Sequence, residues 1–330
     1  MAAALPSRST TITPPARTRR PRQTTSFLKP SCWRSGAGVD GVLGTFLAPF
    51  LVPREKRDTD MKKGKQDALA EASFSTYADP LIGEASAQAS VLEDSTDAED
   101  LHKLRVALRR LRTLLWAYRP ILKEDFDNQQ RALLKYLAGA AGNTRDWDIL
   151  IELVDKKGSA PLLDAFREQR SATAAKSRDT LSHAKLKHML HESLSEANRE
   201  LNTAAQRTPL TKFARKRVAA AQKQLSKRIR SASKAKGKDY AQLHDVRKAG
   251  KKVRYLVEFF EPLLGSKQRK TLKGLKRMQK RFGALNDVVA SRALLEQHLD
   301  ALPDGAAAQK ALRSLKKEQK RRTKAAVRLL

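Results

Sequence analysis

Residues 101–112 read LHKLRVALRRLR, and residues 243–254 read LHDVRKAGKKVR. In both stretches small or aliphatic residues recur every three or four positions, which is the period of an amphipathic α-helix. The likeness extends without a gap over LHKLRVALRRLRTLLWAYRPIL (101–122) and LHDVRKAGKKVRYLVEFFEPLL (243–264). A helix that returns together with its flanking sequence predicts a chain built as two related halves.

Further likenesses follow each of these helices. Arg131 and Lys135 align with Lys273 and Arg277. After a gap of one residue, GNTRDWDIL (142–150) aligns with GALNDVVAS (283–291). Beyond residue 60 the chain is rich in Ala, Leu, Lys, Arg and Gln and poor in Gly and Pro, which favours helices over strands. We therefore expect an all-α fold with about four helices in each half-repeat, approximately 80–200 and 208–330, packed with pseudo-two-fold symmetry.

Capping and breaking residues predict where the helices begin and end. A capping box at Thr96 begins the first of the two helices, and Pro120 perturbs or ends it. A second helix covers about 125–140 and is followed by a break at 138–143. The remaining predicted helices are another over TRDWDILIEL from Thr144, a long one from Pro161 to about 200, one from Thr208-Pro209 to about 232, one capped by Asp239, one over about 267–282, one from a break at Gly283 to about 299, and a last one after a Pro303–Gly305 turn.

Each of the two opening helices has a histidine and three basic residues on a single face. At ~100° per residue, Arg105, Arg109 and Arg112 lie within about 80° of His102, beside a leucine stripe. The second copy repeats this face with His244, Arg247, Lys251 and Arg254. Further basic positions are Arg131 and Lys135 in the first half and the ridge of Lys270, Lys273, Arg277 and Lys280 in the second.

Most of the other charges, such as Lys103, Arg110 and the run at 316–322, are expected on ordinary solvated faces. The repeated stripe is different, because like charges at i,i+4 destabilise a helix and few carboxylates lie nearby. Glu258 could pair with Arg254, but its counterpart Trp116 could only stack on Arg112. Uncompensated like charge in both halves predicts an anion bound between them.

The repeat also pairs His102 with His244, which favours a role for both. A protonated imidazole donates two N–H groups to phosphate, so we expect affinity to weaken above about pH 7 as the histidines lose their protons. The spacings of His183, His188 and His191 do not form a metal-ligand motif, and the sequence predicts no metal and no cofactor.

The formal net charge of +32 predicts a polyanionic partner: nucleic acid, an anionic membrane surface or polymeric phosphate. Nucleic-acid signatures are absent and aromatic residues make up only 5% of the chain, so weak non-specific affinity is the alternative expected from charge alone. The apolar stripes are needed for bundle packing, so membrane insertion is not expected. Cys32 is the only cysteine, which predicts a reducing, cytoplasmic location.

An enzyme is not predicted, because the sequence has no P-loop and no nucleophile motif. Asp146 and Asp287 are single carboxylates in separate halves, and each is expected to cap a helix or pair with an arginine. Residues 1–60 differ from the rest and are interpreted as a disordered leader or an over-called start with Met61 as the initiator.

The paired LHxxRxxxxRxR-type segments, each followed by G-x-x-[RN]-D, resemble the CHAD family (conserved histidine α-helical domain) over about 65–330. The resemblance implies two four-helix bundles around a basic central cleft or pore, binding of inorganic polyphosphate, and association with polyphosphate granules. The family's aspartate after the glycine falls on Asp146 and Asp287, and its RYxxE pattern on 254–258. One difference between the halves is Asn286, where the first half has Arg145.

Taken together, the sequence predicts a non-catalytic polyphosphate-binding protein. The predicted site residues are His102, Arg105, Arg109, Arg112, Arg131, Lys135, His244, Arg247, Lys251, Arg254, Lys270, Lys273 and Arg277.

Overall fold

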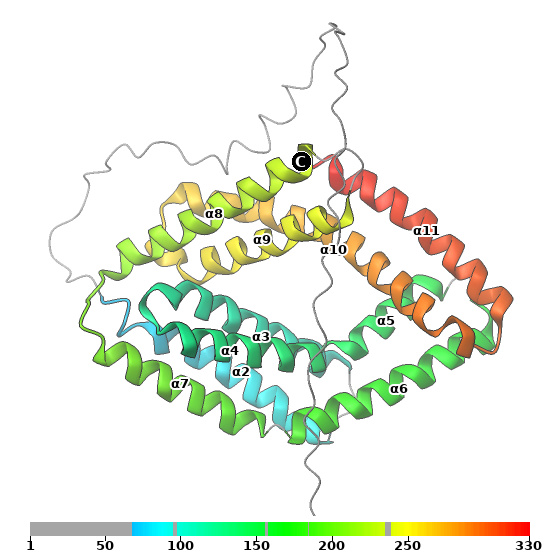
Figure 1. Ribbon diagram of the computed structural model, residues 1–330, viewed down its shortest axis with the longest axis horizontal. Helices are drawn as coiled ribbons and strands as arrows, with labels where there is room; N and C mark the ends of the chain where they lie inside the picture. Colours follow the sequence, from blue (N-terminus) through cyan, green and yellow to red (C-terminus); the bar gives the residue numbers. More distant parts are fainter. Residues whose placement is uncertain (1–67, 95–97, 156–157, 184, 235–238) are drawn as a thin grey trace, which may run out of the picture. The chain divides into compact units, whose positions relative to one another are not determined.

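A computed structural model describes residues 68–94, 98–155, 158–183, 185–234 and 239–330. Within these ranges the chain is helical, apart from turns and an isolated bridge between Leu69 and Pro209, which confirms the all-α class (Figure 1). The predicted leader and the capping box at Thr96 lie outside the described residues. The helices in the described ranges all belong to one compact unit.

The first repeat opens with α2 (Phe74–Asp94) and the stripe helix α3 (Ala98–Tyr118). A short 3-10 turn, η1 (Arg119–Ile121), follows and contains Pro120, so the predicted end of this helix is confirmed. The chain continues in α4 (Glu124–Ala140) and α5 (Asn143–Val154), with the predicted break between them. The helix α3 ends before Pro120 because the proline nitrogen cannot donate the next intrahelical hydrogen bond.

The next segment corrects a prediction. Instead of one long helix to about residue 200, the structure has α6 (Ala160–His183) and α7 (Leu186–Thr203). Lys185 lies between them with φ of 44°, a left-handed conformation that cannot continue a helix. The polar sequence here gives no glycine or proline at the break, so the local pattern did not indicate it.

The second repeat consists of α8 (Leu210–Lys234), the stripe helix α9 (Tyr240–Phe259), η2 (Glu261–Leu263), α10 (Ser266–His298), η3 (Leu299–Ala301) and α11 (Gly305–Val327). Asp239 caps α9 by accepting a hydrogen bond from the Ala241 amide, as predicted. The predicted break at Gly283 is wrong, because α10 runs through it without interruption. A single glycine costs only about 1 kcal/mol in a helix, and packing of α10 on both sides of Gly283 outweighs that.

The two repeats correspond in the way that their helices pack. α2 and α3 pack as α8 and α9 do, α3 and α4 as α9 and α10 do, and α5 and α6 as α10 and α11 do. The continuous α10 therefore takes the place of α4 and α5 together. The extra residue in the first repeat would turn a continuous helix by about 100°, and the chain breaks there instead. α7 has no counterpart and connects the repeats.

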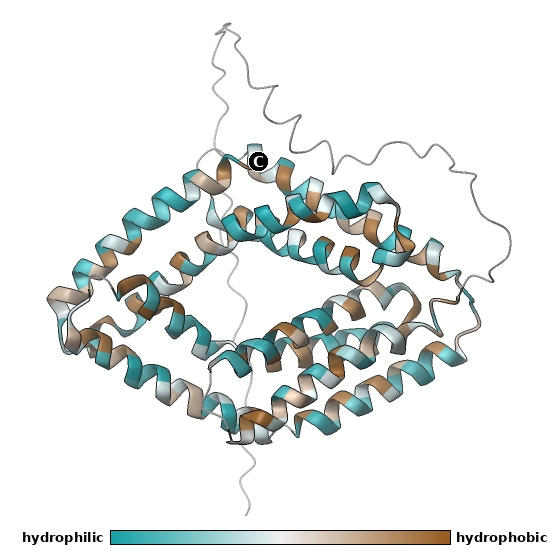
Figure 2. Ribbon diagram, turned by 180° about the vertical axis from the view of Figure 1, so that it is seen from behind, coloured by the Kyte–Doolittle hydropathy of each residue, from teal (hydrophilic) through white to brown (hydrophobic). Residues whose placement is uncertain are grey.

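The hydrophobic core is shared between the repeats. One cluster joins α2, α3, α4 and α7 to α8, α9 and the first half of α10. A second joins α5 and α6 to the second half of α10 and to α11. Figure 2 shows apolar and polar residues interleaved along each helix, as expected for amphipathic helices in a bundle. Of the helices in the described ranges, none is long and apolar enough to span a membrane.

Candidate anion-binding site

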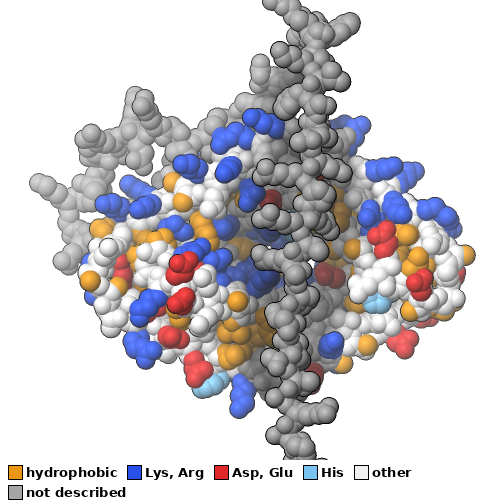
Figure 3. Space-filling model, viewed as in Figure 1, with side chains coloured by type: hydrophobic (Ala, Val, Ile, Leu, Met, Phe, Trp, Pro, Cys, Tyr) orange, Lys and Arg blue, Asp and Glu red, His pale blue; other side chains and the backbone are white. Residues whose placement is uncertain are grey.

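The two stripe helices pack against each other, and their basic faces converge. Arg105 and Arg109 from α3 meet Arg247 and Lys251 from α9. We call these four cations, with Asp146 of α5 and Asp287 of α10, the central cluster. Figure 3 shows Lys and Arg side chains gathered in the hollowed middle of the face viewed there.

Arg105 is anchored by the backbone of the α4–α5 break. Its Nη1 donates a 2.9 Å hydrogen bond to the carbonyl oxygen of Gly142 and lies 3.7 Å from Asp146 Oδ1. A Cβ on Gly142 would come within 2.5 Å of the Arg105 guanidinium, so the glycine makes room for this close approach. The equivalent Gly283, inside α10, has nothing within 4 Å of such a Cβ.

Lys251 is the most strongly perturbed cation of the cluster. Burial, reinforced by the positive charges of Arg109, Arg247 and Arg105, lowers its pKa to about 6, and Asp287 opposes this shift. In the free protein near neutral pH the amine is therefore mainly uncharged. A bound anion would supply the negative charge that restores the ammonium form.

Two arginines of the cluster retain unused donors. Among the described residues, the buried Nε atoms of Arg109 and Arg247 have no hydrogen-bond partner. Burial lowers the pKa of the Arg247 guanidinium. The attraction of Asp287 opposes this shift, and the repulsion of Arg109 adds to it. Buried donors without partners are costly, and a phosphate oxygen accepts from such forks.

Asp146 and Asp287 come from separate repeats but lie close enough to influence each other. Burial raises the pKa of both carboxyls, against the opposing attraction of Arg105 on Asp146 and of Arg247 on Asp287. The expected pairing of Asp146 with an arginine is confirmed. No group of three or more potential ligands able to hold a metal occurs among the described residues.

His102 and His244 flank the cluster from equivalent positions. Burial is the main reason that the pKa of each lies below its usual value, and nearby cations add to the shift. These shifts favour the neutral imidazoles in the free protein, and the expected weakening of anion binding above about pH 7 stays a prediction. His244 stacks on Tyr240 at 5.6 Å between ring centroids, and the Tyr240 hydroxyl donates to Asn286 Oδ1.

The outer stripe positions have different environments in the two repeats. Arg254 is 2.9 Å from Glu258 Oε1 and donates to Gln279 Oε1, so its charge is already compensated, and the expected Glu258 pair is confirmed. For Arg112, burial and then the charges of Arg131 and Arg109 lower the pKa, and no ion pair of Arg112 occurs among the described residues.

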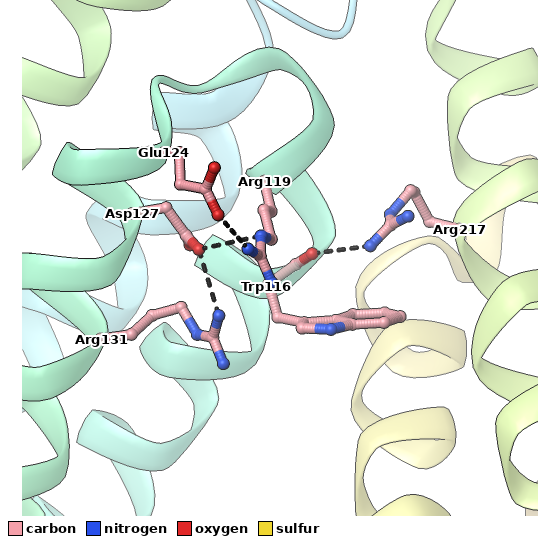
Figure 4. A network of polar contacts seen from close by, with 6 residues as sticks. All are labelled: Trp116, Arg119, Glu124, Asp127, Arg131 and Arg217. Carbon is pink, nitrogen blue, oxygen red and sulfur yellow. Dashed lines mark hydrogen bonds and ion pairs between the residues drawn. The ribbon is translucent and has the colours of Figure 1, made fainter.

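Trp116 is occupied by partners that the sequence did not predict. Instead of Arg112, the cations over its ring are Arg217 of α8, at 4.3 Å from the centroid, and Lys252 of α9, at 4.0 Å. Arg217 also donates to the Trp116 carbonyl oxygen at 2.7 Å (Figure 4). For Lys252, burial and then Arg131 and Arg217 lower the pKa to about 8.

Arg131 is held by a buried aspartate beside this tryptophan. Asp127 has no exposed side-chain surface and accepts from Arg131 at 3.1 Å, and Arg119 lies 3.5 Å from the same oxygen (Figure 4). Arg119 donates in turn to Glu124. Arg131 therefore borders the basic surface but has a carboxylate partner of its own.

The other predicted residues lie elsewhere. Lys135 is exposed and lines a hollow of about 1040 Å³ between α4, α5, α6 and α10, which borders the cluster at Asp146. Arg277 lines a groove between α10 and α11. Lys270 and Lys273 are exposed on α10, and no contact between them and the central cluster occurs among the described residues. The predicted ridge is thus outside the cluster.

The sequence analysis did not identify Arg145, whose charge lowers the pKa of His102 and of Asp287, or Tyr240, which stacks on His244. Lys252 and Arg217 were missed as well. Arg145 could have been found from the G-x-x-[RN]-D likeness, since it directly precedes Asp146. No sequence signal linked α8 to Trp116, which lies far away in the chain.

Comparison with known proteins agrees with this architecture. A family model described as the CHAD domain matches residues 77–296. The crystal structure of the CHAD domain from the plant Ricinus communis superimposes with a TM-score of 0.66 at 26% identity, covering 79% of this chain and 91% of that one. A structure of PptA from Streptomyces chartreusis gives a TM-score of 0.58 at 17% identity, covering 78% and 96%. No curated protein sequence matches the chain.

Proposed function

The chain belongs to the CHAD domain family, and we propose that it binds inorganic polyphosphate at the central cluster. The main support is the convergence of Arg105 and Arg109 with Arg247 and Lys251, from two repeats, at one place. Two carboxylates do not neutralise the three arginines of the cluster together with the flanking arginines, and Lys251 adds a further positive charge once it is protonated. The residual charge and the unused guanidinium donors favour a bound polyanion over an empty site.

A chain of phosphates suits the arrangement of these cations. Arginine forks bind phosphate oxygens bidentately, whereas lysine acts as a point charge. The basic surface continues beyond the cluster. The charge of Arg109 is close enough to lower the pKa of Arg112, and the charge of Arg112 is close enough to lower the pKa of Lys252. An extended, flexible anion would follow this path from the cluster toward Trp116.

Each group of the cluster has a distinct part in the proposed binding. Arg105, held by Gly142 and Asp146, and Arg247, beside Asp287, bind phosphate oxygens from opposite repeats. Lys251 takes up a proton as the anion enters. The histidines donate N–H groups from the flanks, and His102 Nδ1 is buried without a hydrogen-bond partner among the described residues. We propose binding without turnover, in association with polyphosphate granules.

Non-specific nucleic-acid binding is the competing proposal from charge alone. Base recognition without sequence preference usually needs aromatic rings on which bases can stack. Trp116, which borders the basic surface, has its ring covered by Arg217 and Lys252. This occupancy favours a ligand that consists of phosphate only.

A competition titration on the full chain at near-physiological salt tests this proposal. Labelled long-chain polyphosphate is challenged with duplex DNA, RNA and single-stranded DNA at matched phosphate concentration. We expect polyphosphate to stay bound against a large excess of all three. Displacement by nucleic acid at parity would mean that the protein recognises charge density alone, in favour of the competing proposal.

A further inference from the structure

A second strongly basic surface lies between the last two long helices, away from the central cluster. It encloses a hollow of about 670 Å³. We call it the α10–α11 groove and define it by six cations: Arg277, Lys280 and Arg281 of α10, and Arg321, Lys324 and Arg328 of α11.

The two walls of the groove have the same spacing. On α10 the lining positions are i, i+3, i+4 and i+7, beginning at Arg277 and ending at Ala284. On α11 the same spacing runs from Arg321 to Arg328, with Ala325 at i+4. This spacing puts four side chains of a helix on one side. The alanine in each wall leaves space between the long basic side chains.

Carboxylates do not account for this charge. Among the described residues, no ion pair is formed by Arg277, Lys280 or Arg281, nor by Lys324 or Arg328. Among the described residues, the carboxylate that pairs with cations of the lining is Glu318, which pairs with Arg321 and with Arg322, both at 2.6 Å. Two facing rows of like charge repel each other, and a bound anion would remove that repulsion.

The groove is distinct from the central cluster. At ~100° per residue, Arg277 lies on the opposite side of α10 from Asn286 and about 160° from Gln279. Those two residues face α9, where Asn286 accepts from Tyr240 and Gln279 from Arg254. α10 therefore has one face toward the central cluster and its surroundings and another toward the groove.

We propose that the α10–α11 groove is a second contact site for the same polyphosphate chain, so that a long chain occupies the central cluster and the groove together. This inference rests on the proposed function. The groove lining contains only Arg, Lys and Ala, with no aromatic ring on which a base could stack, which favours a bare phosphate chain over nucleic acid. Two linked contacts make the second binding event intramolecular, so affinity should rise steeply once a chain is long enough to reach both.

The corresponding hollow of the first repeat offers an internal comparison. It lies between α4, α5, α6 and α10, and its α6 wall has the same spacing, from Thr173 through Lys176 and Ser177 to Thr180. Lys135 of α4 stands there in place of Arg277. With two lysines and the carboxylate of Asp146 in its lining, this hollow should bind phosphate far more weakly. The second contact is thus expected on one side of the molecule only.

The test uses the full chain and a groove variant, Arg277→Gln with Arg281→Gln and Arg328→Gln, which leaves the Glu318 pairs intact. The control with equal charge loss is Lys216→Gln with Lys223→Gln and Lys227→Gln, three exposed lysines on α8. Dissociation constants are measured for tripolyphosphate and for long-chain polyphosphate over a salt series. All six substituted side chains are exposed, and circular dichroism checks that both variants fold.

We expect the groove variant to bind long chains about ten- to a hundredfold more weakly than the control variant does, and its salt dependence to be shallower. Tripolyphosphate affinity at the central cluster should change less than about twofold. A long-chain affinity equal to that of the control overturns the second site. An equal loss for both chain lengths also overturns it, because the groove would then be the main site.

The two proposals fail in different ways. If the wild-type chain bound neither polyphosphate, the proposed function itself would be wrong. If the wild type bound both and the groove variant matched the control, only the second site would be wrong. Displacement of the long chain from the groove by duplex DNA at matched phosphate would also overturn it, in favour of a nucleic-acid contact there.

Discussion

The central cluster and the α10–α11 groove are both rich in arginine and lysine, yet they are built differently. The cluster takes cations from both repeats, partly buries them, and holds Arg105 with a carboxylate and a backbone carbonyl. The groove uses the second repeat alone, and its six defining cations are exposed. Buried, positioned groups give shape and selectivity, whereas exposed rows add affinity that grows with their charge and weakens as the salt concentration rises.

The largest effect is expected in the cluster, from Arg105→Ala combined with Arg247→Ala. Each substitution removes charge-assisted hydrogen bonds of about 1.5–3 kcal/mol, so polyphosphate affinity should fall about 10²- to 10⁴-fold. Fluorescence anisotropy with labelled polyphosphate measures the change, and Arg199→Ala with Arg313→Ala, two exposed arginines, is the control. If the double variant bound as the control does, with an unchanged fold, the cluster would be the wrong site.

A smaller effect is expected from the two aligned glycines. Gly142→Ala would displace the Arg105 guanidinium, because its Cβ would lie 2.5 Å from that group, and should weaken binding about tenfold. Gly283→Ala has free space around it and lies inside α10, so it should leave binding unchanged and stabilise the fold by up to about 1 kcal/mol. Equal affinities of the two variants would show that the Gly142 contact does not position Arg105.

The cluster should also make binding depend on pH. Free Lys251 has a pKa of about 6, and a bound anion raises it, so binding takes up a proton and affinity falls as the pH rises above 6, by at most about tenfold per pH unit. The facing charges are Arg105 and Arg109 of α3, Arg247 of α9 and Asp287 of α10. Calorimetry in buffers of different ionisation enthalpy measures the proton uptake.

Lys251→Arg provides the control for this pH dependence, because a guanidinium stays charged throughout the range. Its binding should vary less between pH 6 and 8 than that of the wild type. Lys252, with a pKa of about 8, is outside the cluster and remains in both proteins. Identical pH profiles of the two proteins would exclude Lys251 as the titrating group.

The smallest expected effect concerns stability without ligand. The folded-state pKa of Lys251 is lowered, so between pH 6 and its ordinary value near 10.5 the unfolded chain binds more protons, and stability rises with pH. Lys251→Met removes this penalty and should stabilise the free protein by about 1 kcal/mol at pH 7, while weakening polyphosphate binding. Thermal unfolding measures the change, and a lower melting temperature for this variant would contradict the account.

Sequence reasoning predicted the features that depend on neighbouring residues. The repeat, the stripe of His102 and its arginines, the end of α3 at Pro120 and the cap at Asp239 are all encoded within a few turns of helix. Convergence of the two stripes was also predictable, because equivalent helices of a symmetric repeat commonly meet near its axis.

Features that depend on packing between distant helices were not predictable. α10 continues through Gly283 because the packing around it favours a helix, and Trp116 meets Arg217 because α8 lies beside it. The ridge at Arg277 looked like an extension of the stripe, but Arg277 lies on the side of α10 away from the cluster, where it lines a groove with α11. A helical wheel gives the face of a residue but not the neighbour that the face meets.

The most direct test of the central claim asks whether both repeats form one anion site. Tripolyphosphate is titrated calorimetrically into the groove variant, alone and with either Arg105→Ala or Arg247→Ala. A shared site predicts that each substitution weakens the binding of every equivalent of ligand while the stoichiometry stays the same. Two independent half-sites would instead lose half of the binding capacity with each substitution and keep the other half at full affinity, which would contradict the account.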